Sequence, residues 1–256
     1  MKRKFMIKSN KPLFFNLGWL FAVLLTFNLI HNATAENWIQ KADMPIPRLF
    51  FSVSAVDNQL YTIGGMLAEP VDFVDAYDPD EDKWVQKASL PAGRAGVVTC
   101  VVGGKIYAIG GWNGQSPALG SVEEYDPATD TWTQKADMST PRTALGVGVV
   151  AGKIYTVGGT SSVQGPGLTT LEIYDPDTDT WTEAPEMPTA RVFLGVGTIA
   201  NKIYAVGGVA EGLGPAILPT VEEFAPNARG YHETFCIIIN RTYAISNQYL
   251  RPARRW

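Results

Sequence analysis

"KIYAIGG", residues 105–111, decides the fold, because its apolar and polar residues alternate and then stop at a pair of glycines. Such alternation predicts a half-buried strand. A glycine-rich loop that holds a phosphate needs a helix directly after it, whose free N–H groups face the anion. Here turn-forming residues follow instead, "WNGQSPALGS" at 112–121, and then a second short alternating stretch. The glycine pair therefore predicts the end of a strand and no phosphate site.

Similar stretches, QLYTIGG, KIYTVGG and KIYAVGG, end at three more glycine pairs in the chain. The first glycines of the four pairs are 46, 48 and 49 residues apart, and a period of this length is typical of repeat architectures. An arginine lies sixteen residues before each first glycine: Arg48, Arg94, Arg142 and Arg191. An aromatic residue precedes a proline-containing turn in each copy: Tyr77, Tyr125, Tyr174 and Phe224. Tryptophans follow the three tyrosines by seven residues, and a further one precedes the series: Trp84, Trp132, Trp181 and Trp38.

Each repeat predicts four short strands joined by turns, which form an antiparallel meander. A single four-stranded sheet cannot bury both of its faces, so such units pack side by side around an axis. The predicted fold class is therefore all-β, a β-propeller of four-stranded antiparallel blades. About four blades are recognisable, followed by a degenerate C-terminal piece.

Residues 38–226 resemble the kelch-repeat proteins, specifically the secreted bacterial type, in their glycine doublets and spaced Tyr and Trp residues. The resemblance implies that each doublet ends the second strand of a blade, where close packing or positive φ excludes a side chain. It also implies that the tyrosines and tryptophans form the core between blades.

Residues 1–35 predict a cleaved signal peptide, with five cations, an apolar run at 17–27 and Ala33-Thr34-Ala35. A single membrane anchor is the alternative, although the run is short for a bilayer, and no stable membrane span is expected after cleavage. The expected location is secreted or periplasmic. Loss of the five cations changes the formal charge from −4 to −9, which argues against a nucleic-acid partner.

Residues 36–226 are predicted to form the propeller, and residues 227–256 a degenerate or truncated terminal blade segment. Trp38 opens a fourth-type strand without preceding blade-mates. We expect residues 38–44 to close the ring by pairing with residues 221–224, which would remove an exposed edge. The rival is an open array with an exposed half-blade. The tail indicates either a naturally short chain or a damaged reading frame near Asn227.

Catalytic and metal-binding constellations are sparse, so we expect no catalytic residue, cofactor or metal site. His232 is the one histidine after residue 35, which excludes the copper site of galactose oxidase-type kelch enzymes, with its two histidines. The acidic stretches at 78–82 and 175–179 imitate the start of a calcium loop, but turn aspartates that bond their own backbone explain them better. Cys100 and Cys236 are expected to be buried thiols.

The leading functional hypothesis is a propeller scaffold that binds a protein or carbohydrate without catalysis. Variable loops on a rigid scaffold are the usual place for binding. One alternative is a sugar-acid mutarotase or epimerase, implied by some exported kelch propellers; another is a truncated fragment without function.

The candidate ligand-binding residues are the four repeated arginines, which would ring the mouth of the axis, and two residues of a long loop: Arg48, Arg94, Arg142, Arg191, Trp112 and Asn113. A structural role for the arginines is the preferred interpretation, because repetition in every unit favours rigid hydrogen-bonded joints. Their expected partners are backbone carbonyls or an acid of a neighbouring blade: Asp75, Glu123, Glu172 or Glu222.

Overall fold

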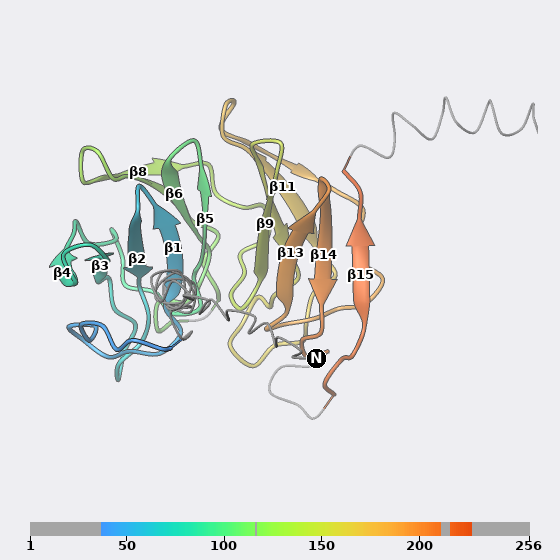
Figure 1. Ribbon diagram of the computed structural model, residues 1–256. Coiled ribbons are helices and arrows are strands. Elements are labelled where there is room, and N and C mark those ends of the chain that lie inside the picture. The colour runs from blue at the N-terminus through green and yellow to red at the C-terminus, as the bar shows by residue number, and fades with distance from the viewer. Residues whose placement is uncertain (1–36, 116, 211–215, 227–256) are drawn as a thin grey trace, which may run out of the picture. The chain divides into compact units, whose positions relative to one another are not determined.

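A computed structural model describes residues 37–115, 117–210 and 216–226 of the protein (Figure 1). The signal peptide predicted at 1–35 and the degenerate segment predicted at 227–256 lie outside these ranges. Within them the chain is all-β, and no helix there is long and apolar enough to cross a membrane. All the strands belong to the compact unit of residues 42–256.

Four antiparallel sheets follow one another along the chain (Figure 1). Blade 1 consists of β1 (Ser52–Val56), β2 (Gln59–Ile63), β3 (Val74–Asp78) and β4 (Lys83–Gln86). Blade 2 consists of β5 (Val98–Val102), β6 (Lys105–Ile109), β7 (Val122–Asp126) and β8 (Thr131–Lys135). Blade 3 consists of β9 (Gly146–Val150), β10 (Lys153–Val157), β11 (Leu171–Asp175) and β12 (Thr180–Glu183). Blade 4 consists of β13 (Gly195–Ile199), β14 (Lys202–Val206) and β15 (Val221–Phe224).

Strand order within every blade follows the chain, as the repeat pattern predicted. The first two strands are joined by two-residue turns in which both residues have positive φ, for example Asp57 and Asn58 at 50° and 60°. Such turns match the twist of a hairpin. The β-propeller arrangement of kelch-type blades is therefore confirmed, with the difference that blade 4 has three strands among the described residues.

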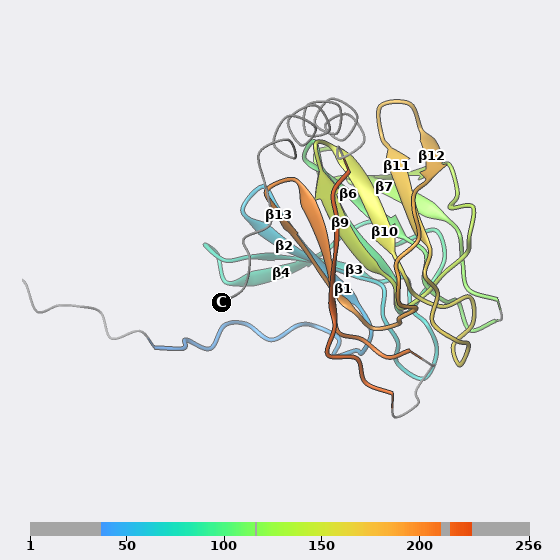
Figure 2. The same ribbon diagram turned by 90° about the vertical axis from the view of Figure 1, so that its right-hand side faces the viewer.

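The hydrophobic core lies between successive blades rather than within one of them. Three buried clusters join blades 1 and 2, blades 2 and 3, and blades 3 and 4. The inner strands contact one another in the order β1, β5, β9 and β13, and Figure 2 shows β9 beside β13. Because each sheet buries its faces against its neighbours, stability depends on the junctions between blades.

A hydrogen-bonded network fixes the outer part of each complete junction. At the junction of blades 1 and 2, Asp130 Oδ1 accepts the Tyr125 hydroxyl at 2.6 Å and the Ala88 backbone N–H at 2.8 Å. The indole N–H of Trp132 donates to the Ala88 carbonyl at 2.8 Å. Tyr174, Asp179, Trp181 and Ala136 repeat the arrangement between blades 2 and 3. The spaced Tyr and Trp are therefore interblade residues, as the resemblance implied.

These junctions predict a specific sensitivity to acid. The Tyr125 hydroxyl holds the pKa of Asp130 below its ordinary value, and the Ala88 N–H acts in the same direction. A carboxyl group with a lowered folded-state pKa stabilises the fold above its unfolded pKa of about 4, and the contribution is lost as the pH falls through the folded value. We expect Asp130→Asn to lose less unfolding free energy than the wild type between about pH 5 and pH 3.

Urea denaturation at each pH measures this difference. Asparagine can accept the same two hydrogen bonds and tolerates the φ of 53° at this position, so the fold is retained. Asp137→Asn, on the exposed segment after β8, is the matched control and should keep the wild-type pH profile. Identical profiles for Asp130→Asn and the wild type would show that this network does not carry the acid sensitivity.

The closure of the ring by residues 38–44 stays a prediction. Among the described residues, 37–44 form no strand and β15 pairs with β14. The Ala42 N–H donates to Asp82 Oδ1 at 2.8 Å, and its carbonyl accepts the Trp84 indole N–H at 2.9 Å. Asp82 and Trp84 of blade 1 thus offer Ala42 the partners that Ala88 finds on blade 2, as in the joints between successive blades.

Two smaller expectations concern aspartates and cysteines. Asp78 Oδ1 accepts the backbone N–H groups of Asp80 and Glu81, at 2.9 and 3.1 Å, so it shapes a turn as predicted. No group of potential metal ligands is found among the described residues. Cys100 is a free, partly buried thiol whose pKa is raised by burial, while Cys236 lies outside the described ranges.

Candidate functional site

The repeated arginines lie inside the blades. The Arg142 guanidinium, with a fully buried side chain, donates to the Glu172 carboxylate at 2.5 Å and to the Gly158 carbonyl at 2.9 Å. Burial lowers the pKa of Arg142, and the Glu172 charge acts in the opposite direction. The remaining pairs have the same form, at 2.8, 2.6 and 2.9 Å: Arg48 with Asp75, Arg94 with Glu123, and Arg191 with Glu222.

Each acid belongs to the same blade as its arginine, which corrects the expectation of a neighbouring blade. The connection between blades runs through the arginine backbone instead. Gly111 N–H of blade 2 donates to the Arg142 carbonyl of blade 3 at 2.9 Å, and Gly65 makes the same bond to Arg94. The arginines thus have the geometry of structural joints, and their charged groups do not line an open surface.

A second repeated position, two residues after each arginine, lies at the mouth of the axis. Phe50, Gly96, Ala144 and Phe193 all have positive φ, between 53° and 61°. Their backbones form a continuous arc, because Gly96 N–H donates to Phe50 O, Ala144 to Gly96 and Phe193 to Ala144, at 2.9, 3.4 and 3.0 Å. Consequently one residue from every blade meets at this mouth.

A pocket of about 100 Å³ opens at this arc. Its lining comes from the arc and the residues beside it, and from the loops between the second and third strands of blades 1 to 3. The lining includes Phe50, Met66, Trp112, Thr143, Val163 and Phe193. Phe50 and Phe193 are each about half-exposed, as is Val163. The pocket is therefore an apolar, aromatic surface on the face that carries the variable loops.

Of the candidate binding residues predicted from the sequence, only some line this pocket. Trp112 lines the pocket, whereas Asn113 is exposed and does not line it, its Oδ1 accepting the Gln115 N–H at 3.1 Å. The arginines do not line it either. Sequence reasoning missed Phe50 and Phe193, although the repeat alignment carried the signal: bulky residues occupy a position that is Gly96 in blade 2.

The pocket has little polar chemistry to offer. None of its described lining residues is ionisable. Its two threonine hydroxyls already donate to backbone carbonyls, Thr143 to Gly96 at 3.4 Å and Thr160 to Ser162 at 2.8 Å. The arrangement can therefore accept an apolar group but supplies no acid, base or nucleophile from these residues.

Blade order, glycine doublets and interblade Tyr and Trp define a kelch-type β-propeller. A family model, the KLHDC2/KLHL20/DRC7 Kelch-repeats domain, matches residues 23–208, so the chain belongs to the kelch-repeat family. No curated protein matches the chain. A solved structure titled "Structure of YjhT" is similar at 18% identity and a TM-score of 0.60, covering 73% of this chain and 67% of that one. At this identity the similarity concerns the fold alone.

Proposed function

We propose that the protein is a binding scaffold without catalysis, which holds a protein partner by an apolar side chain at the axis mouth. One observation carries the proposal: two bulky aromatic residues, Phe50 and Phe193, are held half-exposed at positive φ. A bulky residue in this conformation is strained, and glycine occupies the equivalent position in blade 2. Since the arc needs positive φ at this position in every blade, a bulky apolar side chain kept there, half-exposed at a pocket, points to a binding role.

A protein partner suits the pocket better than a carbohydrate or an acidic ligand. A sugar needs hydrogen-bonding groups, and the two threonine hydroxyls of the pocket are already engaged. A carboxylated ligand needs an accessible cation, and the repeated guanidinium groups are buried in ion pairs. An apolar side chain requires only removal of apolar surface from water. Kelch membership supports the same choice, because kelch repeats typically mediate protein binding.

The mutarotase or epimerase alternative requires a carboxylate or histidine at the mouth, and none is among the described pocket residues. Export to a secreted or periplasmic location remains part of our proposal and rests on the leader-like residues 1–35. Removal of those residues leaves the more acidic chain described above. Such a chain would favour partners with apolar or basic contact surfaces over nucleic acids.

Selection of short random peptides on the immobilised protein tests the proposal. We expect the selected peptides to carry an aromatic or aliphatic anchor and to bind Phe193→Asn about tenfold or more weakly, as for a buried aromatic anchor. Asparagine is well tolerated at positive φ, so the variant should be at least as stable as the wild type. Fluorescence anisotropy measures binding, and thermal unfolding measures stability.

Val85→Ser, an exposed apolar residue on β4 that does not line the pocket, is the control and should leave peptide binding unchanged. Peptides with acidic anchors that bind Phe193→Asn as tightly as the wild type would contradict the proposal. The fragment hypothesis predicts yet another outcome, in which no peptide is selectively enriched.

A further inference from the structure

Blades 1 and 4 expose faces that the other blades bury. Leu60 of β2 is 42% exposed, whereas its equivalents in blades 2, 3 and 4, Ile106, Ile154 and Ile203, are at most 2% exposed. This is the face that a blade turns to the blade before it. Blade 1 therefore presents an apolar face with the composition of a blade junction but without a described neighbour.

Blade 4 exposes the opposite face, the one that a blade turns to the blade after it. Val206 and Val221 are 46% and 60% exposed. Their equivalents in blades 1 to 3 are at most 3% exposed: Ile63, Ile109 and Val157 for the first, and Val74, Val122 and Leu171 for the second. The two ends of the blade array thus carry the two halves of one junction.

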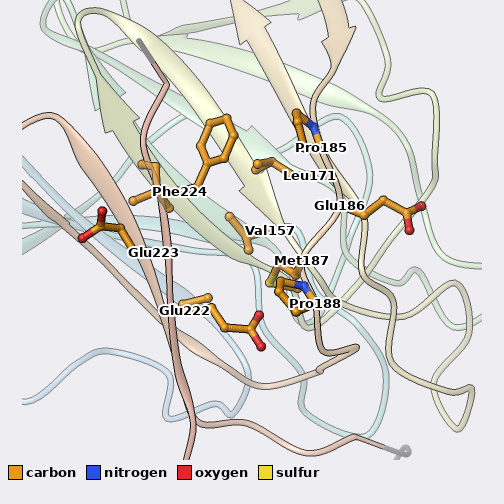
Figure 3. Close-up of a pocket in the computed structure, with 11 residues that line it drawn as sticks. Val157, Leu171, Pro185, Glu186, Met187, Pro188, Glu222, Glu223 and Phe224 are labelled. Atoms are coloured by element: carbon orange, nitrogen blue, oxygen red, sulfur yellow. The ribbon is translucent and has the colours of Figure 1, made fainter. Parts of the chain in front are cut away.

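A pocket of about 230 Å³ between blades 3 and 4 has the composition of an interblade core that lacks one member (Figure 3). Between blades 1 and 2, the corresponding cluster packs against Trp132 of the fourth strand. The pocket residues occupy the same repeat positions as that cluster, in the pairs Pro185 and Ala88, Met187 and Leu90, Ile203 and Ile106, Phe224 and Tyr125. The missing member is the tryptophan, because the described part of blade 4 has no fourth strand.

Pro185 and Phe224 show how this pocket, the slot for a fourth strand of blade 4, differs from the junctions that have their tryptophan. In blades 2 and 3, an aspartate accepts an alanine N–H and a tyrosine O–H. Pro185 has no N–H and Phe224 has no O–H, so the slot does not need an aspartate from the incoming strand. The Pro185 carbonyl is still the equivalent of the acceptor that the indole N–H uses elsewhere.

The chain also contains a segment whose sequence fits this slot. Residues 38–45, "WIQKADMP", closely match "WTQKADMS" at 132–139, which supplies β8 of blade 2. Ala88 bonds to blade 2, whereas Trp84, four residues before it, lies in β4 of blade 1. A tryptophan four residues before such an alanine therefore belongs to the blade that precedes the alanine's partner blade. Trp38 stands in that relation to Ala42, and Ala42 is bonded to blade 1.

We propose that copies of this chain associate head to tail, with residues 38–41 of one copy adding to β15 of another. Trp38 fills the pocket between blades 3 and 4, and blade 1 of the incoming copy covers blade 4. Edge pairing and burial of an aromatic anchor together give such a contact its affinity. Charge also agrees, since Lys135 pairs with Glu124 at 3.3 Å in blade 2 and the equivalent residues here are Lys41 and Glu223.

A second copy is the occupant that the exposed faces favour. The added strand alone would fill the pocket and pair β15, but it would leave Leu60 and Val206 exposed. A second copy supplies the strand and the covering face together, and the Ala42 connection to blade 1 then reproduces the joint found between the described blades. The association is heterologous, since each copy uses two different surfaces.

Disulfide cross-linking of the full chain tests the proposal. Glu124 lies opposite Thr133 in blade 2, so the same register places Ile39 opposite Glu223. We expect a mixture of Ile39→Cys chains and size-tagged Glu223→Cys chains to give a covalent product containing one of each on oxidation. Both positions are partly or largely exposed, so the variants should fold, which circular dichroism checks. Wild-type chains report the background from the native cysteines.

Two further variants make the test specific. Val85→Cys replaces Glu223→Cys as the control, because β4 is the outer strand of a complete blade, and no mixed product is expected. Adding Trp38→Ala to the Ile39→Cys chain should reduce the yield of mixed product about tenfold or more. A link that forms only within a single Ile39→Cys, Glu223→Cys chain would show that the chain's own segment occupies the slot. That result, or the absence of any link, would overturn the proposal.

Discussion

Replacing Arg142 with alanine is expected to lower the free energy of unfolding by about 3–5 kcal/mol, because it leaves a buried carboxylate without its partner. Glu172 is 1% exposed and bonded to Arg142 at 2.5 Å. The variant also leaves the Gly158 carbonyl without the guanidinium donor. Urea denaturation without any ligand measures the loss of unfolding free energy. A small yield of folded Arg142→Ala would agree with that loss.

A double variant separates the joint from a ligand-binding role. Replacing both charged groups of a buried pair with apolar residues of similar size is often close to neutral. Arg142→Met with Glu172→Met should therefore recover much of the stability lost in Arg142→Ala. Unchanged stability of Arg142→Ala, together with lost binding to acidic glycans, would reverse our interpretation and place a ligand at the arginines.

Gly110→Ala is expected to destabilise the protein by roughly 2–5 kcal/mol, the sum of left-handed backbone strain and local overpacking. Gly110 has a φ of 63°, and a Cβ atom there would overlap the Arg142 carbonyl and approach the Met138 methyl group. Its neighbour Gly111 donates its N–H to the same carbonyl. The neighbouring blade cannot move away without breaking that bond. Thermal and urea unfolding measure the effect.

Gly103→Ala is the matched control for this substitution. Gly103 has nearly the same φ, 58°, but a Cβ atom there would meet nothing within 4 Å. Only the backbone strain applies, so we expect a loss of about 1–2 kcal/mol. Equal losses for the two variants would show that φ alone explains the glycine doublets and that close approach between blades contributes nothing.

Sequence reasoning predicted the local features well. Alternating residues predicted the strands, the glycine doublets predicted strand ends, and the 46- to 49-residue period predicted the blades. These features depend on backbone conformation and on neighbours within one repeat. The preferred structural role of the arginines also agrees with the geometry, because a residue repeated in every blade is explained by a contact repeated in every blade.

Positions between repeats were predicted less well. Trp112 lines the pocket and Asn113 does not, and sequence reasoning missed Phe50 and Phe193. Their φ values and exposure are set by the arc of backbone bonds that joins four blades. The pairing of residues 38–44 stays a prediction, and Ala42 finds on blade 1 the partners that the equivalent alanines find on the next blade.

By itself, the sequence determined the kelch-repeat family, the strand order within a blade and the residues that pack between blades, because each follows from short-range periodicity. Only the tertiary structure decided which arginine meets which acid, where the apolar mouth lies and which blade faces lack a neighbour among the described residues. Those properties depend on contacts between residues that lie 16 or more positions apart, such as Arg142 with Gly158 and Glu172. Sequence spacing fixes the period of such contacts, but burial and direction arise only when the blades stack.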